Sequence, residues 1–90
     1  MLDPDEVLAG WRSRGFSGGV WVDAPGQVWR DFVHAEDELL MVIEGRLELE
    51  IDGAHVAPRA GEEVLIPAGA RHTVRNVGGT TARWAYAYRR

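Results

Sequence analysis

The chain has 90 residues, of which 46% are hydrophobic and 27% are charged, a composition typical of one soluble globular domain. Its formal net charge of -4 argues against a nucleic-acid partner, because phosphate binding needs a basic surface. The chain contains neither cysteine nor lysine, which excludes disulfides, thiolate metal ligands, thiolate nucleophiles and lysine Schiff-base chemistry.

Residues 1–15 predict a short N-terminal helix, with a frayed terminal turn as the alternative. Asp3 is a good N-cap, Pro4 suits the first helical position, and Gly15 marks the end of the helix. An apolar stripe at helical spacing is formed by Val7, Leu8 and Trp11.

From Phe16 onward the apolar residues recur with a period of two, which predicts β-strands. The expected strands, in chain order, cover residues 20–22, 27–34, 38–44, 46–51, 54–57, 64–66, 71–77 and 80–88. Turn residues separate them, and Asp52-Gly53 is typical of a tight hairpin. So many short strands predict an all-β antiparallel sandwich or barrel over residues 16–90, which forms a single domain with the helix over residues 1–90.

Regular alternation over residues 27–34 puts on one face Arg30, Phe32 and His34, and on the other face Trp29. An arginine that points into a small barrel needs an anionic partner, because an unpaired buried charge is costly. That partner is either a nearby acidic side chain or a carboxylate or phosphate of a bound molecule. A strand phase shifted by one residue would instead expose Arg30 to solvent.

Three possible metal ligands lie in separate stretches of this pattern: His34, Glu38 and His72. Glu38 opens a strand after a short connection, so its carboxylate can approach His34. His72 follows a Pro-Ala-Gly turn that can bring its strand alongside. Two imidazoles and one carboxylate resemble the donor set of non-heme iron sites and would equally serve zinc. The alternative for each residue is an ordinary structural or solvated side chain.

Residues 61–76 resemble the second sequence motif of the cupin superfamily, and each anchor position of that motif is matched. The anchors are Gly61, Pro67, Gly69, His72 and Asn76. The first cupin motif is matched more weakly, at Gly26, His34, Glu38 and Gly45. Phe32 stands where that motif has its first histidine. The rest of the chain fits a small single-domain cupin in length and in number of strands.

The resemblance implies a cupin-like jelly-roll barrel with one metal ion inside it. Carried over residue by residue, it makes His34, Glu38 and His72 the ligands of a divalent ion, which could be Fe, Mn, Ni or Zn. Phe32 has no lone pair to offer and would form an apolar wall instead. We expect Asn76 to have a structural role, because its side chain can cap backbone groups.

The last expected strand carries an aromatic stripe at Trp84, Tyr86 and Tyr88, which could line the mouth of a pocket. The alternatives for this stripe are the hydrophobic core and a subunit interface. The candidate substrate-binding residues are Arg30, Phe32, Trp84 and Tyr86. Residues 39–43 are apolar on both faces of their strand, which fits a homodimer.

These features predict a metal-binding small cupin that recognises or transforms a small polar or anionic molecule inside its barrel. The alternatives are a metal-free, non-catalytic ligand-binding or sensor module and a structural homodimer, and whether the protein is an enzyme is left open. No secretion signal follows Met1 and no apolar run approaches about 20 residues, so we expect a cytoplasmic protein without a membrane span.

Overall fold

A computed structural model describes residues 2–90 of the chain as one short helix followed by eight β-strands. The helix α1 covers Pro4–Ser13. The strands, in chain order, are β1 (Phe16–Asp23), β2 (Val28–Phe32), β3 (Glu38–Glu44), β4 (Leu47–Ile51), β5 (Ala54–Val56), β6 (Glu63–Ile66), β7 (His72–Asn76) and β8 (Ala82–Arg89). The expected all-β class with a short N-terminal helix is confirmed.

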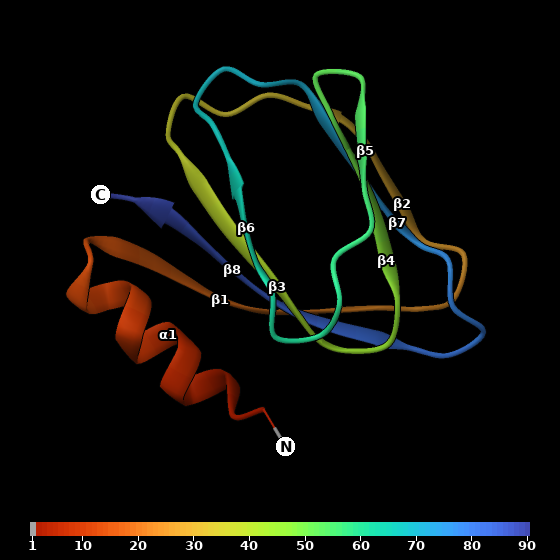
Figure 1. The fold of residues 1–90 in the computed structure, drawn as a ribbon, viewed down its shortest axis with the longest axis horizontal. Helices are drawn as coiled ribbons and strands as arrows, with labels where there is room; N and C mark the ends of the chain where they lie inside the picture. Colours follow the sequence, from red (N-terminus) through yellow and green to blue (C-terminus); the bar gives the residue numbers. More distant parts are fainter. Residues whose placement is uncertain (1) are drawn as a thin grey trace.

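The strands form two four-stranded antiparallel sheets that face each other as in a jelly roll (Figure 1). Sheet A has the strand order β1-β8-β3-β6, and sheet B has the order β2-β7-β4-β5. The first and last strands are therefore neighbours, and β8 lies between β1 and β3. Within residues 2–90, no helix has the length and apolar character needed to cross a membrane.

The helix α1 lies outside the barrel, against sheet A (Figure 1). Asp3 caps its first turn by accepting a hydrogen bond from the backbone N–H of Asp5 at 2.9 Å. Leu8 and Trp11 pack in one cluster with Leu39 of β3. The helix thus buries apolar surface on the outer face of β3 within a single chain. This contact accounts for apolar residues on both faces of the strand without a partner subunit.

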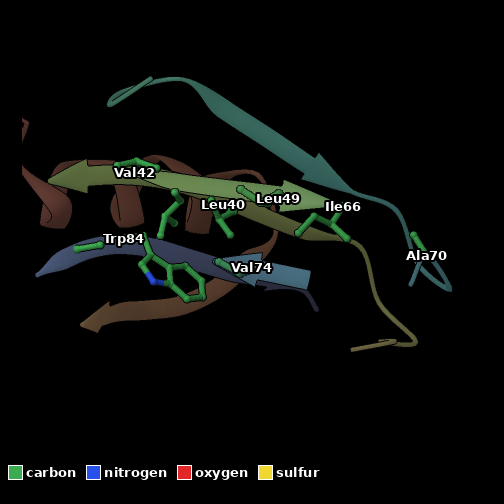
Figure 2. Packing of buried hydrophobic residues seen from close by; sticks show 9 residues of the cluster. Leu40, Val42, Leu49, Ile66, Ala70, Val74 and Trp84 are labelled. Carbon is green, nitrogen blue, oxygen red and sulfur yellow. The ribbon is translucent and has the colours of Figure 1, made fainter. Parts of the chain in front are cut away.

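The main hydrophobic core lies between the two sheets (Figure 2). Leu40 and Val42 of β3 and Leu49 of β4 belong to it, and each has 0% of its surface exposed. Val74 and Trp84 pack in the same cluster (Figure 2). Full burial of one such aliphatic side chain is worth roughly 1.5–3 kcal/mol. Alternate residues of the facing strands therefore hold the two sheets together.

A β-bulge in β2 changes which of its residues face the interior. Trp29 pairs with Val74, and Phe32 pairs with His72, so β2 advances three positions while β7 advances two. Asp31 takes a φ of 56° at the bulge, in the left-handed region that aspartate tolerates better than most residues. The extra residue leaves Trp29 and Phe32 on the same, inward side of the strand.

The bulge also turns Arg30 away from the interior. Arg30 is exposed and does not line the pocket that Trp29 and Phe32 help to form. The expectation that Arg30 points into the barrel and meets an anionic group there is therefore wrong. The physical reason is that the alternation of β2 is interrupted, whereas the expectation required it to be regular.

Candidate functional site

A tight turn positions His72 at the start of β7. The backbone N–H of Ala70 donates to the carbonyl of Pro67 at 3.1 Å, and Gly69 has a φ of 80° between them. Glycine fits this conformation because it has no Cβ to clash. The N–H of Gly69 also donates to the carbonyl of His34 at 2.8 Å. This bond holds the turn that leads into His72 against the segment that carries His34.

Asp37 fixes the backbone that leads into Glu38. The carboxylate of Asp37 accepts a hydrogen bond from the N–H of Ala68 at 2.8 Å, and its carbonyl accepts one from the N–H of Arg89 at 2.9 Å. Glu38 then opens β3 between β6 and β8, with only 3% of its surface exposed. The carboxylate of Glu38 is therefore carried inside the barrel by an anchored backbone.

The side chains of His34, Glu38 and His72 meet inside the barrel. Oε1 of Glu38 lies 3.4 Å from Nε2 of His34 and 3.5 Å from Nε2 of His72. One possible ligand atom from each residue lies within 4.8 Å of the other two. Glu38 and His72 are buried, and His34 is half-buried. The structure thus brings together the three residues that the sequence suggested as metal ligands.

The ring of His72 is oriented by a backbone carbonyl. Its Nδ1 lies 3.2 Å from the carbonyl oxygen of Ala70, which can only accept a hydrogen bond. In the neutral ring the proton therefore sits on Nδ1, and the lone pair of Nε2 faces Glu38. The carboxylate of Glu38 raises the pKa of His72 above its usual value because it favours the protonated ring, whereas burial acts in the opposite direction.

Glu38 has a buried carboxylate oxygen without a hydrogen-bond donor. Among residues 2–90 nothing donates to its Oε1, and the distances to the two imidazoles are long for hydrogen bonds. Leaving such an oxygen unsatisfied is costly. Two ligand atoms that lie about 2.1 Å from one tetrahedrally coordinated ion are about 3.4 Å apart, close to both observed spacings. The donor set therefore fits a divalent cation.

Tyr88 adds a fourth polar group beside this cluster. Its hydroxyl lies 3.5 Å from Nε2 of His34. Burial raises the pKa of Tyr88 to about 12, and the negative charge of Glu38 acts in the same direction. The phenol therefore keeps its proton at neutral pH and is available as a hydrogen-bond donor.

The cluster lines a pocket of about 320 Å³, near the lower end of the range for ligand sites. Most of the lining is aromatic and consists of Trp21, Trp29, Phe32, Trp84, Tyr86 and Tyr88. The other lining residues are His34, Glu38, His72 and Val74. Some neighbouring rings meet edge to face, such as those of Trp21 and Trp29, whose centroids lie 5.7 Å apart. The pocket thus combines a small group of polar donors with broad apolar walls.

Among the candidate substrate-binding residues, Phe32, Trp84 and Tyr86 line this pocket and Arg30 does not. Trp29 also lines the pocket but was not among the candidate substrate-binding residues, and regular alternation had placed it on the face opposite Phe32. Asp31 was the one residue in the sequence that could have indicated the bulge, and with it the inward position of Trp29. An aspartate is among the residues that tolerate the backbone conformation of a bulge.

Comparison with known sequence families agrees with the resemblance that the two sequence motifs indicate. A family model described as a cupin domain matches residues 19–88. The chain is 36% identical over 87 residues to polyketide synthase CurC of Streptomyces cyaneus, a match that covers 96% of this chain and 54% of that protein. It is 32% identical over 84 residues to the tetracenomycin polyketide synthase protein TcmJ of Streptomyces glaucescens, with coverages of 92% and 54%. The chain thus spans about half the length of these curated relatives.

Solved structures share the arrangement of the two sheets. The crystal structure of a Cupin 2 conserved barrel domain protein from Salinispora arenicola superposes with a TM-score of 0.75 at 33% identity, covering 84% of this chain and 64% of that one. The similarity therefore extends over most of the barrel described above.

Proposed function

The chain belongs to the cupin superfamily, and on this premise we propose that it binds a divalent metal ion and a flat, largely apolar molecule in the same pocket. His34, Glu38 and His72 hold the ion through their imidazole nitrogens and carboxylate. The aromatic lining holds the body of the molecule. The observation that carries the proposal is the buried Oε1 of Glu38, which accepts no hydrogen bond from residues 2–90.

A divalent ion held by His34, Glu38 and His72 would act as a Lewis acid towards an oxygen atom of the bound molecule. The protein itself fixes the donors. The carbonyl of Ala70 orients the ring of His72, and Asp37 anchors the backbone before Glu38. The hydroxyl of Tyr88 lies 3.5 Å from Nε2 of His34, on the same side of the pocket, where it can donate a hydrogen bond to the bound molecule. The aromatic walls exclude water from the bound molecule and restrict its orientation.

The pocket lining supports an aromatic ligand over a small acid. The expectation of an anionic ligand depended on Arg30, which is exposed. The lining is mainly aromatic, and flat rings stack on such surfaces. The two curated relatives carry polyketide synthase names. Aromatic polyketides combine fused rings with oxygen atoms along their edges, so a polyketide-derived aromatic is the ligand class that we propose.

Metal analysis after reconstitution with Fe(II), Mn(II), Ni(II) or Zn(II) tests the metal site. The wild type is expected to retain a stoichiometric amount of at least one of these ions. His72→Ala and Glu38→Gln are each expected to weaken binding by at least about tenfold. His55→Ala is the matched control, because His55 is exposed and is expected to bind the ion as the wild type does. Equal, near-zero occupancy in the wild type and in His72→Ala with every ion would contradict the proposal.

A metal-free binding module is the second candidate. The aromatic side chains of the pocket support one another without a metal ion, as Trp84 and Tyr86 do at 6.0 Å between ring centroids. Thermal melting with 1,8-dihydroxyanthraquinone, in Zn(II) and separately in EDTA, distinguishes the two. A rise in melting temperature that requires Zn(II) supports the proposal. The same rise in EDTA supports the metal-free module, and no rise in either condition contradicts the proposed ligand class.

A further inference from the structure

Asp23 is a buried carboxylate that belongs neither to the metal donors nor to the pocket lining. It ends β1 and exposes 2% of its surface. Its Oδ1 accepts a hydrogen bond from Nε1 of Trp29, and its Oδ2 accepts one from Nε1 of Trp84, each at 3.0 Å. Both tryptophans line the pocket. One carboxylate therefore accepts hydrogen bonds from two of the aromatic side chains that line the pocket.

The two indoles come from opposite sheets. Trp29 lies on β2 of sheet B, whereas Trp84 lies on β8 of sheet A. A buried indole N–H needs an acceptor, and a carboxylate makes stronger hydrogen bonds than a neutral acceptor. Asp23 therefore fixes the two rings relative to each other, which apolar packing alone would do less strictly.

The backbone around Asp23 is anchored by Asn76. The side-chain amide of Asn76 donates to the carbonyls of Asp23 at 3.3 Å, Ala24 at 3.1 Å and Thr80 at 3.0 Å. Its oxygen accepts a hydrogen bond from the N–H of Gly78 at 3.0 Å. These bonds are the structural role expected for Asn76, and they restrict the movement of Asp23.

Asp23 lies at a distance from the metal donors along the strands of sheet A. It pairs with Ala82 of β8, whereas Glu38 pairs with Tyr88 of the same strand. The strand between Ala82 and Tyr88 is about 20 Å long at the usual rise per residue. A substitution at Asp23 that changes only the indoles is therefore expected to leave the metal donors in place.

We propose that Asp23 is a positioning residue that makes the pocket selective for fused-ring molecules by fixing Trp29 and Trp84. The ligand class rests on the proposed function, whereas the metal site is not needed for the inference. Fixed indoles offer a preformed apolar surface, and preformed surfaces bind rigid, flat molecules at a lower entropic cost. If the two indoles are free to move, the pocket loses its preference for ligands with several fused rings over ligands with a single ring.

Asp23→Asn is the first test, because its amide presents an N–H group to one of the two indole N–H groups and cannot bond to it. The probes are 1,8-dihydroxyanthraquinone, with three fused rings, and catechol, with one. By calorimetry, Asp23→Asn is expected to weaken binding of the anthraquinone by at least about tenfold and of catechol by less than about threefold. Zn(II) affinity is expected to stay within about threefold of the wild type.

The double variant Trp29→Phe/Trp84→Phe is the matched control, because it removes both N–H donors and keeps aromatic rings in place. In this background, adding Asp23→Asn is expected to change the preference between the probes by less than about twofold. If Asp23→Asn does not fold, Trp29→Phe and Trp84→Phe alone provide the test. Each removes one donor and is expected to lower the preference for the anthraquinone.

Near-UV circular dichroism of the tryptophans and Zn(II) binding separate failure of this inference from failure of the proposed function. Unchanged indole bands or an unchanged probe preference in Asp23→Asn overturn the positioning role. Equal loss of both probes and of Zn(II) overturns it too, because that pattern means general structural damage. If the wild type binds no Zn(II) but Asp23→Asn still lowers the preference, the metal proposal fails and the positioning role stands. A wild type that binds neither probe refutes the ligand class, and the near-UV spectra then decide the positioning of the indoles by themselves.

Discussion

Phe32 limits the number of donors at the candidate metal site. Its ring centroid lies 6.1 Å from that of His34 and 6.2 Å from that of His72. The side chain is 40% exposed while it lines the pocket. Because a phenyl ring cannot coordinate a metal ion, position 32 contributes an apolar surface where the first cupin motif has a histidine.

We predict that Phe32→His raises the affinity for Zn(II) by at least about tenfold, because it adds an imidazole beside two existing ones. Competition with a chromophoric chelator measures the change. Phe32→Leu is the control for loss of the ring without a new donor, and its affinity should stay within about threefold of the wild type. An affinity of Phe32→His equal to that of Phe32→Leu would mean that position 32 does not reach the ion.

The sequence allowed the donor cluster to be predicted but not the role of Asp23. His34, Glu38 and His72 occupy recognisable motif positions, and their side chains offer lone pairs. Asp23 precedes Ala-Pro-Gly, where an aspartate is most simply interpreted as a turn residue. Its partners Trp29 and Trp84 lie 6 and 61 positions away in the chain, so only the folded barrel brings them together.

Among the contacts between elements, Glu63 of β6 joins α1 to sheet A. Its Oε1 accepts hydrogen bonds from Nε1 of Trp11 at 2.8 Å and from Nη1 of Arg14 at 2.7 Å. Its Oε2 accepts one from Nη2 of Arg14 at 3.0 Å. The Arg14 guanidinium lowers the pKa of Glu63, although burial opposes this shift. The helix is therefore docked by a polar contact as well as by its apolar face.

We predict that Glu63→Gln lowers the melting temperature at neutral pH. Because the pKa of Glu63 is lower in the folded than in the unfolded state, its stabilisation is present above the unfolded pKa and is lost as the pH falls through the folded pKa. The difference in melting temperature between wild type and Glu63→Gln should therefore disappear below about pH 4. Since the side chains of Arg14 and Glu63 are 52% and 34% exposed, the effect should be small and should weaken in salt.

Thermal melts at neutral and acidic pH measure this dependence. Glu44→Gln is the control, because Glu44 is an exposed glutamate on the neighbouring strand β3. If the melting temperatures of wild type and Glu63→Gln differ by the same amount at both pH values, the role of the ionised carboxylate is contradicted.

The strands were predictable where apolar and polar residues alternate regularly. They were less predictable where glycines or a bulge interrupt this alternation. The strand over 38–44 is found with the expected bounds. The first strand begins at Phe16, earlier than the expected residue 20, because the intervening glycines hide the pattern. Gly18 is required there by the neighbouring strand, since a Cβ would lie 1.8 Å from the carbonyl oxygen of Tyr86. In β2, the bulge at Asp31 reverses the facing of Arg30, which no period of two can reveal.

For the whole molecule, stability depends on the core between the sheets. We predict that Leu40→Ala, at a site with 0% exposure, costs about 2–5 kcal/mol of unfolding free energy. Leu65→Ala is the matched control, since Leu65 is 52% exposed and its loss should cost no more than about 0.5 kcal/mol. Urea denaturation measures both. Similar losses for the two variants would contradict the assignment of the core.

The class and the turns of the whole fold followed from sequence, but the pairing of the strands did not. Asp52 and Gly53 both take positive φ values, of 47° and 83°, as the tight hairpin requires. Alternation and turn residues report on each strand and its immediate neighbour in the chain. They carry no information on the pairing of β1 with β8, which depends on packing between distant segments.

The central place of β8 in sheet A has a consequence for synthesis on the ribosome. Because β8 lies between β1 and β3, neither strand has that neighbour until residues 82–89 have left the exit tunnel. Until then, β1 and β3 lack the strand that joins them in sheet A, and apolar surface that is left exposed during folding is prone to aggregation. The pairing of β1 with β8, which lie far apart in the sequence, also makes folding slow relative to helical domains of similar size.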